Sequence, residues 1–340
     1  MRGEQFIAKG FTGEQGLTTT KEAQTRLGLL FSEDEQLIPK SEIFNDTLFS
    51  EKAKGSPIKE LIAEAIADPT KTERAAEALY AVGATLGMLH ERTERPILAT
   101  TDLTEQVVND VTTDRDKIMR HLDELSVASL VDIDAVDING IKERVKEFTV
   151  PEYVSLIHGD AHLDQFFHEE GGATVEIVDY DDIREGDPMA DLSRLISSQR
   201  DWCRTYGASR ELETHLTREV AEGYTSVRKE SGLLPDSEEL DMMRVVTYEL
   251  RLQLVKLKNF SDIRQKMTIV GAHLGLSEHE VVTSTEDQAI VIDSYLSSDD
   301  QKKLQSLRVV TSELTDILTY LRPVQGAEPA QDEHTVDLAA

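Results

Sequence analysis

The stretch from residue 153 to residue 195 constrains the fold most, because short apolar runs alternate in it with polar blocks. The first run, YVSLI at 153–157, ends in the block HGDAHLDQ at 158–165. The second run, ATVEIV at 173–178, ends in the acidic block DYDD at 179–182. Val, Ile and Tyr bounded by Gly and charged residues are typical of short strands. We therefore expect two neighbouring strands that deliver carboxylates to one edge.

Asp160, Gln165 and Asp179 are the candidate chemical groups of this stretch. Asp160 can act as a base near an accepting hydroxyl group, and Gln165 and Asp179 supply oxygen atoms further along the chain. Mg²⁺ prefers oxygen ligands and keeps several waters, so two protein ligands suffice to hold it against phosphates. Phosphoryl transfer requires this combination of a carboxylate and metal-binding oxygens.

The blocks HGDAHLDQ and VDYDD resemble the catalytic and metal loops of the aminoglycoside phosphotransferase-like kinases, distant relatives of protein kinases. The following GDPMADL is similar to the segment that opens the next helix in that family. Gln165 stands where the family usually has Asn, and Gln in this context resembles maltokinases. The resemblance implies an α+β, protein-kinase-like, two-lobed fold that uses ATP and Mg²⁺. It assigns Asp160 as the catalytic residue and Gln165 and Asp179 as the metal ligands.

Other polar residues of the stretch are interpreted as structural. We expect His158 and His162 to brace the loop by hydrogen bonds, and Asp187 and Asp191 to act as turn and helix-cap residues. Asp182 is a candidate substrate contact.

A metal hydrolase is an alternative interpretation, because His158, His162 and His168 cluster with two aspartates and could bind zinc. The spacing disfavours it. No H-E-x-x-H pattern is present, and Gly159 at the glutamate position disfavours a helix through the two histidines.

The N-terminal segment is expected to form a shortened nucleotide-facing lobe. Residues 5–11 predict a strand that carries Lys9, which the resemblance assigns to the α and β phosphates of the nucleotide. A surface lysine on an edge strand is the alternative. Glu22, on a helix predicted to start near Thr19, is the candidate partner of Lys9, although Thr19 and Glu22 also match a capping box. Only eight residues precede Lys9, where such kinases place two strands and a phosphate-covering loop.

Residues 37–40 and 47–52 are predicted to be the last strands of this lobe. Backbone groups near Glu51 and Ala53 are then expected to face adenine. The predicted domains are a reduced N-terminal lobe at 1–52, a catalytic and substrate lobe at 53–322, and a disordered acidic tail at 323–340.

Apolar residues at helical spacing predict that the larger lobe is mainly helical. The predicted helices start near Pro57 and cover 74–90, parts of 102–148, 211–230, 237–258, 261–274 and 301–321. His90 is interpreted as a helix-end residue.

The chain carries a formal net charge of -29, with 65 acidic and 36 basic residues. Such a surface repels nucleic acid and anionic membranes, and it favours a neutral or cationic small-molecule acceptor. The single cysteine, Cys203, is interpreted as a buried or idle thiol. No apolar run reaches the roughly 20 residues of a membrane helix, so a cytoplasmic protein is expected. Nothing in the sequence indicates the oligomeric state.

The sequence thus predicts an ATP-dependent phosphotransferase that moves the γ-phosphoryl group to a hydroxyl of a sugar, an amino sugar or an aminoglycoside. A catalytically degenerate kinase-like binding or regulatory protein is the second hypothesis, motivated by the shortened lobe.

Overall fold

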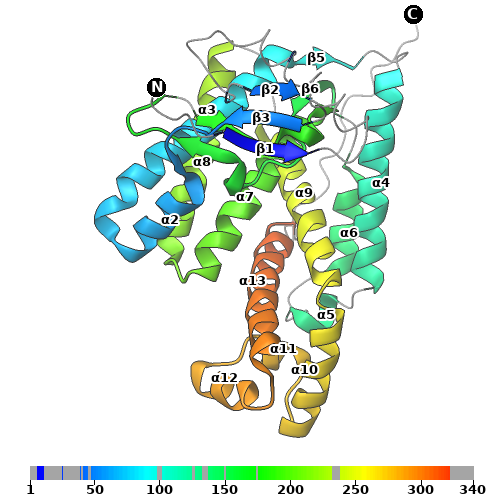
Figure 1. Ribbon diagram of the computed structural model, residues 1–340. Helices are drawn as coiled ribbons and strands as arrows, with labels where there is room; N and C mark the ends of the chain where they lie inside the picture. The colour runs from blue at the N-terminus through cyan, green and yellow to red at the C-terminus, as the bar shows by residue number, and fades with distance from the viewer. Residues whose placement is uncertain are drawn as a thin grey trace, which may run out of the picture.

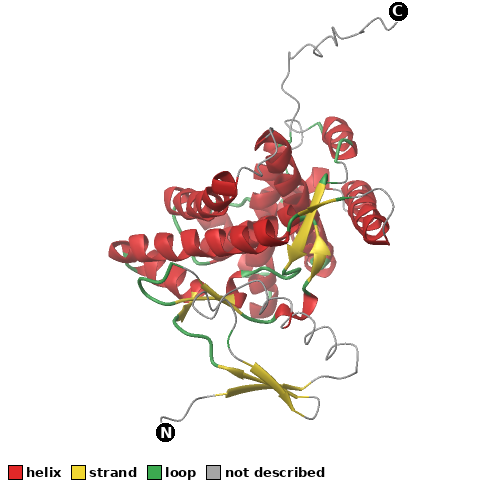
Figure 2. Cartoon of the chain, turned by 90° about the horizontal axis from the view of Figure 1, so that it is seen from above, coloured by secondary structure: helices red, strands yellow, loops and turns green. Residues whose placement is uncertain are grey.

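The computed structural model describes residues 6–10, 25, 39, 41–44, 47–97, 102–124, 127–131, 137–148, 151–173, 175–231 and 238–321. A small antiparallel sheet is formed by β1 (Phe6–Gly10), β3 (Thr47–Glu51) and β2 (Ser41–Phe44), in that order. Figure 2 shows this sheet to one side of a large helical body. Among the described residues, no helix is both long and apolar enough to cross a membrane.

The sheet confirms the predicted strand around Lys9, which is paired with Leu48 of β3. Of the strand predicted at 37–40 only Pro39 is described, and it lies outside any strand, while β2 is assigned to Ser41–Phe44. Proline has no N–H to donate to a strand ladder, which fits its position outside the sheet. Glu22 lies outside the described residues, as does the predicted tail at 323–340.

The helical body contains the helices that the apolar spacing predicts (Figure 1). They are α2 (Ile58–Ala67), α3 (Thr72–Thr93), α4 (Asp102–Glu124), α5 (Val127–Leu130), α6 (Ile138–Lys146), α7 (Pro188–Thr205), α8 (Arg210–Ser231), α9 (Glu238–Lys258), α10 (Ser261–Leu274), α11 (Glu278–Val282), α12 (Glu286–Asp293) and α13 (Ser298–Tyr320). The sequence analysis missed α11 and α12, because helices of five and eight residues show too little periodicity.

The 153–195 stretch is shared between two short antiparallel sheets. One has the order β4 (Ser56–Pro57), β7 (Phe166–His168), β8 (Val175–Ile177), and the other β5 (Arg95–Pro96), β6 (Tyr153–Ile157), β9 (Arg184–Gly186). The two strands that carry the polar blocks, β6 and β8, therefore belong to different sheets and are not paired. The expectation that these two strands are neighbours in one sheet is therefore wrong.

Helices α3 and α8 pack with their backbones in direct contact. A Cβ atom on Gly83 would lie 2.1 Å from the carbonyl oxygen of Val220, and one on Gly223 would lie 2.1 Å from that of Tyr80. Only glycine permits such an approach. The close packing brings α8 against the end of α3 that faces the 153–195 stretch.

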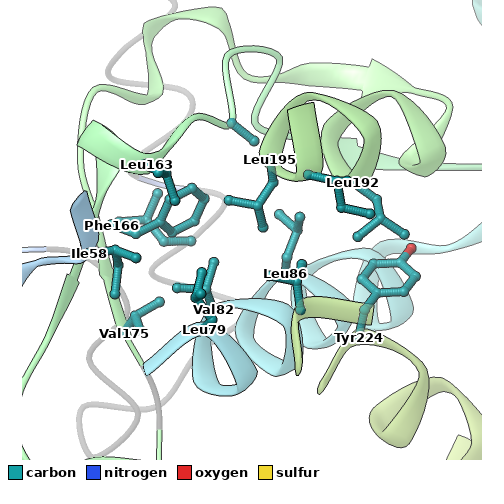
Figure 3. Close-up of a cluster of buried hydrophobic side chains, with 14 of the residues drawn as sticks. Ile58, Leu79, Val82, Leu86, Leu163, Phe166, Val175, Leu192, Leu195 and Tyr224 are labelled. Carbon is teal, nitrogen blue, oxygen red and sulfur yellow. The ribbon is translucent and has the colours of Figure 1, made fainter. Parts of the chain in front are cut away.

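The main hydrophobic core lies between α3, α7 and the β7–β8 pair. Figure 3 shows Leu163 and Phe166 facing Leu79, Val82 and Leu86 of α3, with Leu195 of α7 beside them. Phe166 is completely buried. Burying such side chains contributes roughly 2 kcal/mol each and holds the chain on both sides of Gln165 against the helices.

A second core joins α4, α6, α9, α10 and α13. Figure 1 shows α9 and α13 running from the main body toward α10, α11 and α12 at the bottom of the view. Cys203 of α7 is completely buried, and burial raises the pKa of its thiol to about 12. The interpretation of a buried thiol is confirmed.

Candidate active site

The loop after β6 makes a tight passage at Gly159. Its φ angle is +81°, and a Cβ atom would lie 2.4 Å from the carbonyl oxygen of Asp182. The left-handed backbone and the close approach both require glycine. The loop is thereby pressed against the segment after β8, and Asp160 follows at its tip.

His158 braces this loop in one tautomer. Its Nε2 atom lies 3.0 Å from the carbonyl oxygen of Val178, and its Nδ1 atom accepts the backbone N–H of Asp160 at 3.3 Å. Since a carbonyl oxygen can only accept, Nε2 carries the proton. The ring is 1% exposed and links the two polar blocks, so the expected bracing role is confirmed.

Asp191 fastens the same loop to α7. Its carboxylate accepts the backbone N–H groups of His158 at 2.6 Å and Gly159 at 2.9 Å, and lies 3.2 Å from Nε2 of His90. Burial raises the pKa of Asp191, but the hydrogen bond and electrostatic interaction with His90 and the hydrogen bond from the Gly159 backbone outweigh it, so the pKa lies below its ordinary value. Asp191 lies in the first turn of α7 and not at its cap, so that interpretation is corrected. His90 lies in the last turn of α3, as interpreted, and is in addition a buried partner of Asp191.

Asp187 is the N-cap of α7, as expected, and accepts the backbone N–H of Met189 at 3.0 Å. It also pairs with Arg244 and accepts the hydroxyl of Tyr248 at 3.0 Å. The cap therefore ties α7 to α9.

The Asp160 carboxylate is half-buried and faces two side chains. Arg194 of α7 forms an ion pair with Oδ1, and Nε2 of His162 lies 3.4 Å from Oδ2. His162 is thus more than a brace, because it stands between Asp160 and Gln165, whose Nε2 atom lies 3.1 Å from its ring. The sequence analysis missed Arg194, which no motif marks.

Gln165 and Asp179 lie next to each other, with Gln165 Nε2 3.4 Å from Asp179 Oδ2. The β7–β8 pairing sets this spacing, because Phe166 pairs with Ile177 and the Gln165 carbonyl accepts the N–H of Val178 at 2.9 Å. Rotating the side-chain amide of Gln165 by about 180° exchanges its nitrogen and oxygen, which would bring the oxygen near the Asp179 carboxylate. One amide oxygen and one carboxylate are a donor set that suits Mg²⁺.

Asp179 has a φ angle of +58°, the single positive value among the described residues other than glycine. Such a conformation costs on the order of 1 kcal/mol and is frequent at functional sites. It turns the chain away from β8 at the residue whose carboxylate meets Gln165. The strained backbone marks Asp179 as a functional candidate.

The zinc alternative finds no support in the described residues, where no three His, Cys, Asp or Glu side chains are grouped to hold a metal ion. His168 is buried and bonds the carbonyl oxygen of Gly172 at 2.9 Å. Its Nε2 atom is therefore engaged by a backbone carbonyl group.

Glu51 is the last residue of β3, Ala53 lies in the segment that follows, and the next residue, Lys54, is anchored to β8. The backbone N–H of Lys54 donates to the Glu176 carboxylate at 2.8 Å. Glu176 is 8% exposed, so it holds the connection between the small sheet and the helical body. The side chain of Lys9 lies outside the described residues.

A cavity of about 360 Å³ opens between α4, α7, α9 and β9, and we call it the α4 cavity. Gly159 and Arg194 belong to its wall, so it lies beside Asp160. Asp182, expected as a substrate contact, is not part of this wall.

Residues 26–228 match the model of the family described as "Phosphotransferase enzyme family" (APH). A solved glucosamine kinase in complex with glucosamine, ADP and inorganic phosphate is similar at 13% identity and a TM-score of 0.53, covering 75% of this chain and 68% of that one. Crystal form A of glucosamine kinase is similar at 15% identity and a TM-score of 0.51, and the match covers 76% of this chain and 71% of that one. The aminoglycoside phosphotransferase APH(3'')-Id from Streptomyces rimosus, in complex with ADP and streptomycin, matches at 15% identity and a TM-score of 0.41. This match covers 72% of this chain and 86% of that one. No curated protein matches the sequence.

Proposed function

The chain belongs to the phosphotransferase enzyme family, whose model matches residues 26–228, and from this premise we propose that it transfers the γ-phosphoryl group of ATP to a hydroxyl of a small molecule. The proposed acceptors are sugars, amino sugars and aminoglycosides, and the glucosamine in a solved structure of the same fold supports this range. The observation that carries the proposal is the row of contacts from Asp160 through His162 and Gln165 to Asp179. These contacts bring the proposed base, Asp160, close to the proposed metal ligands, Gln165 and Asp179.

In the proposed reaction Asp160 orients the acceptor hydroxyl and takes its proton. The hydroxyl oxygen forms a bond to the γ-phosphorus while the bond from that phosphorus to the β,γ-bridging oxygen breaks, and ADP leaves. Gln165 and Asp179 hold Mg²⁺, which neutralises charge on the phosphates when bound. The transferring group carries diffuse charge, so positioning and electrostatics supply most of the rate.

Nucleotide binding is assigned to the small sheet and the segment that follows it. We assign Lys9 to the α and β phosphates with Glu22 as its partner, and backbone groups at Glu51 and Ala53 to adenine. The Lys54–Glu176 contact keeps this segment in place against β8.

The proposal is tested by thermal unfolding and by ADP release. Saturating ATP with Mg²⁺ should raise the melting temperature, because a ligand that binds only the folded state stabilises it. A sugar and aminoglycoside screen should then find ADP release that depends on the acceptor. Stabilisation by ATP without turnover on any acceptor would favour the degenerate binding protein, and no stabilisation would refute ATP binding altogether.

A further inference from the structure

The α4 cavity lies beside Asp160 and is the space in which the acceptor binds, an assignment that rests on the proposed function. Its volume of about 360 Å³ is that of a small-ligand site. Gln106 and Thr113 of α4 contribute further polar groups. Which acceptor fits therefore depends on the charged side chains of the wall.

Two of the four carboxylates in this wall are occupied by the protein itself. Asp187 and Asp191 are 4% and 1% exposed. Asp187 pairs with Arg244 and caps α7, while Asp191 meets His90 and the N–H groups of the catalytic loop. Neither carboxylate has room for a ligand cation.

Two arginines of the wall are paired. Arg194 forms its ion pair with Asp160, and Nε of Arg251 lies 2.7 Å from Oδ1 of Asp114. Lys117 Nζ stands 3.9 Å from the same oxygen, so two cations share the one carboxylate of Asp114. The pairing leaves Lys117 as an excess positive charge.

Arg184 of β9 is the remaining cation of the wall. In the part of the chain that the structure describes, its guanidinium bonds only the carbonyl oxygen of Asp182, at 3.2 Å. Its Nη1 atom lies 2.5 Å from where a Cβ of Gly159 would stand, so the guanidinium lies against the residue before Asp160. Asp110 is the remaining exposed carboxylate, and it has no ion-pair partner within the described ranges.

Among the solvent-accessible side chains of the wall, Lys117 and Arg184 are thus opposed by Asp110 alone, since the Asp191 carboxylate is buried against the backbone of His158 and Gly159. This local balance is the reverse of the chain's net charge of -29 and runs against the expectation of a cationic acceptor. A ligand with several ammonium groups would place like charges together in a partly desolvated site.

We propose that the acceptor is a sugar-sized hydroxy compound that carries a single carboxylate, and that the Arg184 guanidinium binds this carboxylate. A guanidinium matches a carboxylate with two parallel hydrogen bonds. A phosphate dianion matches less well, because its second negative charge would lie near the Asp110 carboxylate.

Matched triplets test the proposal. For glucose, galactose and mannose, the parent sugar, the 2-amino sugar and the uronic acid are compared by kcat/KM for ADP release with ATP and Mg²⁺. In at least one triplet the uronic acid should exceed both others by about tenfold, the worth of one charged hydrogen bond. A preference for amino or parent sugars, or for the 6-phosphates over the uronic acids, overturns the proposal, as does the absence of any difference.

Variants of Arg184 connect the preference to one residue. Arg184→Gln should raise the KM for the uronic acid about tenfold and remove its advantage, and Arg184→Lys should restore part of it. The exposed Arg218 of α8 is the matched control, and Arg218→Gln should keep the preference. Calorimetric binding without nucleotide should show the same loss in Arg184→Gln, which a role confined to the transferring phosphate would not produce. If ATP stabilises the protein but uronic acids have no advantage, this proposal alone fails.

Discussion

The hydroxyl of Tyr224 lies 3.0 Å from Nδ1 of His90, deep between α8 and α3. The opposite nitrogen of His90 meets Asp191, which in turn holds the backbone of His158 and Gly159. A row of buried polar groups therefore runs from the α3–α8 contact to the loop that carries Asp160. The loop's position depends on residues that never meet a substrate.

Asp191→Asn should weaken both stability and activity. The new amide presents a donor to backbone N–H groups that need an acceptor, and leaving such buried groups unpaired costs roughly 3 kcal/mol. Urea unfolding should show this loss, and kcat should fall more than the KM for ATP changes. The exposed Asp116→Asn is the control. Wild-type stability of Asp191→Asn would show that the loop does not depend on this carboxylate.

Gly159→Ala should be far more harmful than Gly207→Ala. Both glycines have positive φ angles, +81° and +73°, so alanine costs about 1 kcal/mol of backbone strain at each. Nothing lies within 4 Å of a Cβ at Gly207, whereas one at Gly159 meets the Asp182 carbonyl oxygen at 2.4 Å. The difference in unfolding free energy and in kcat between the two variants therefore measures the cost of the steric clash between a Cβ at residue 159 and the Asp182 carbonyl oxygen. Equal effects would contradict it.

The proposed roles of Asp160 and Asp179 predict different losses. Asp160→Asn should abolish ADP release yet keep the thermal stabilisation by ATP and Mg²⁺, because the base does not hold nucleotide. Asp179→Asn should reduce that stabilisation itself and raise the Mg²⁺ concentration needed for it about tenfold or more. Magnesium titrations followed by thermal unfolding measure both. If Asp160→Asn kept full activity, or if Asp179→Asn bound the nucleotide normally, the corresponding assignment would be refuted.

The sequence predicts the protein-kinase-like α+β fold correctly, because both the loop motifs and the helical periodicity are local patterns. The contact between Gln165 and Asp179 follows from two strands a few residues apart. The partners of Asp191 and Asp160 could not be predicted. His90 is 101 residues away from Asp191, and Arg194 occupies an ordinary helical position. Such contacts depend on how α3 and α7 pack, which no local pattern records.

A last prediction concerns pH and the buried Glu249 of α9. Burial raises the pKa of Glu249 to about 7, although Arg200, whose Nη1 lies 3.0 Å from Oε1, acts in the opposite direction. The folded state therefore holds the proton more tightly than the unfolded state. The resulting stabilisation is fully present below the ordinary pKa of a glutamate and is lost as the pH rises through about 7.

Glu249→Gln should remove this pH dependence, because glutamine stays neutral. The unfolding free energy of the wild type relative to Glu249→Gln should fall by about 2 to 3 kcal/mol between pH 5 and pH 8. Urea unfolding at four pH values in that range measures the difference. The exposed Glu77→Gln, whose carboxylate makes no hydrogen bond or ion pair among the described residues, should leave the wild-type pH dependence unchanged. A constant difference between the wild type and Glu249→Gln would mean that Glu249 is ionised throughout and that its ion pair with Arg200 outweighs burial.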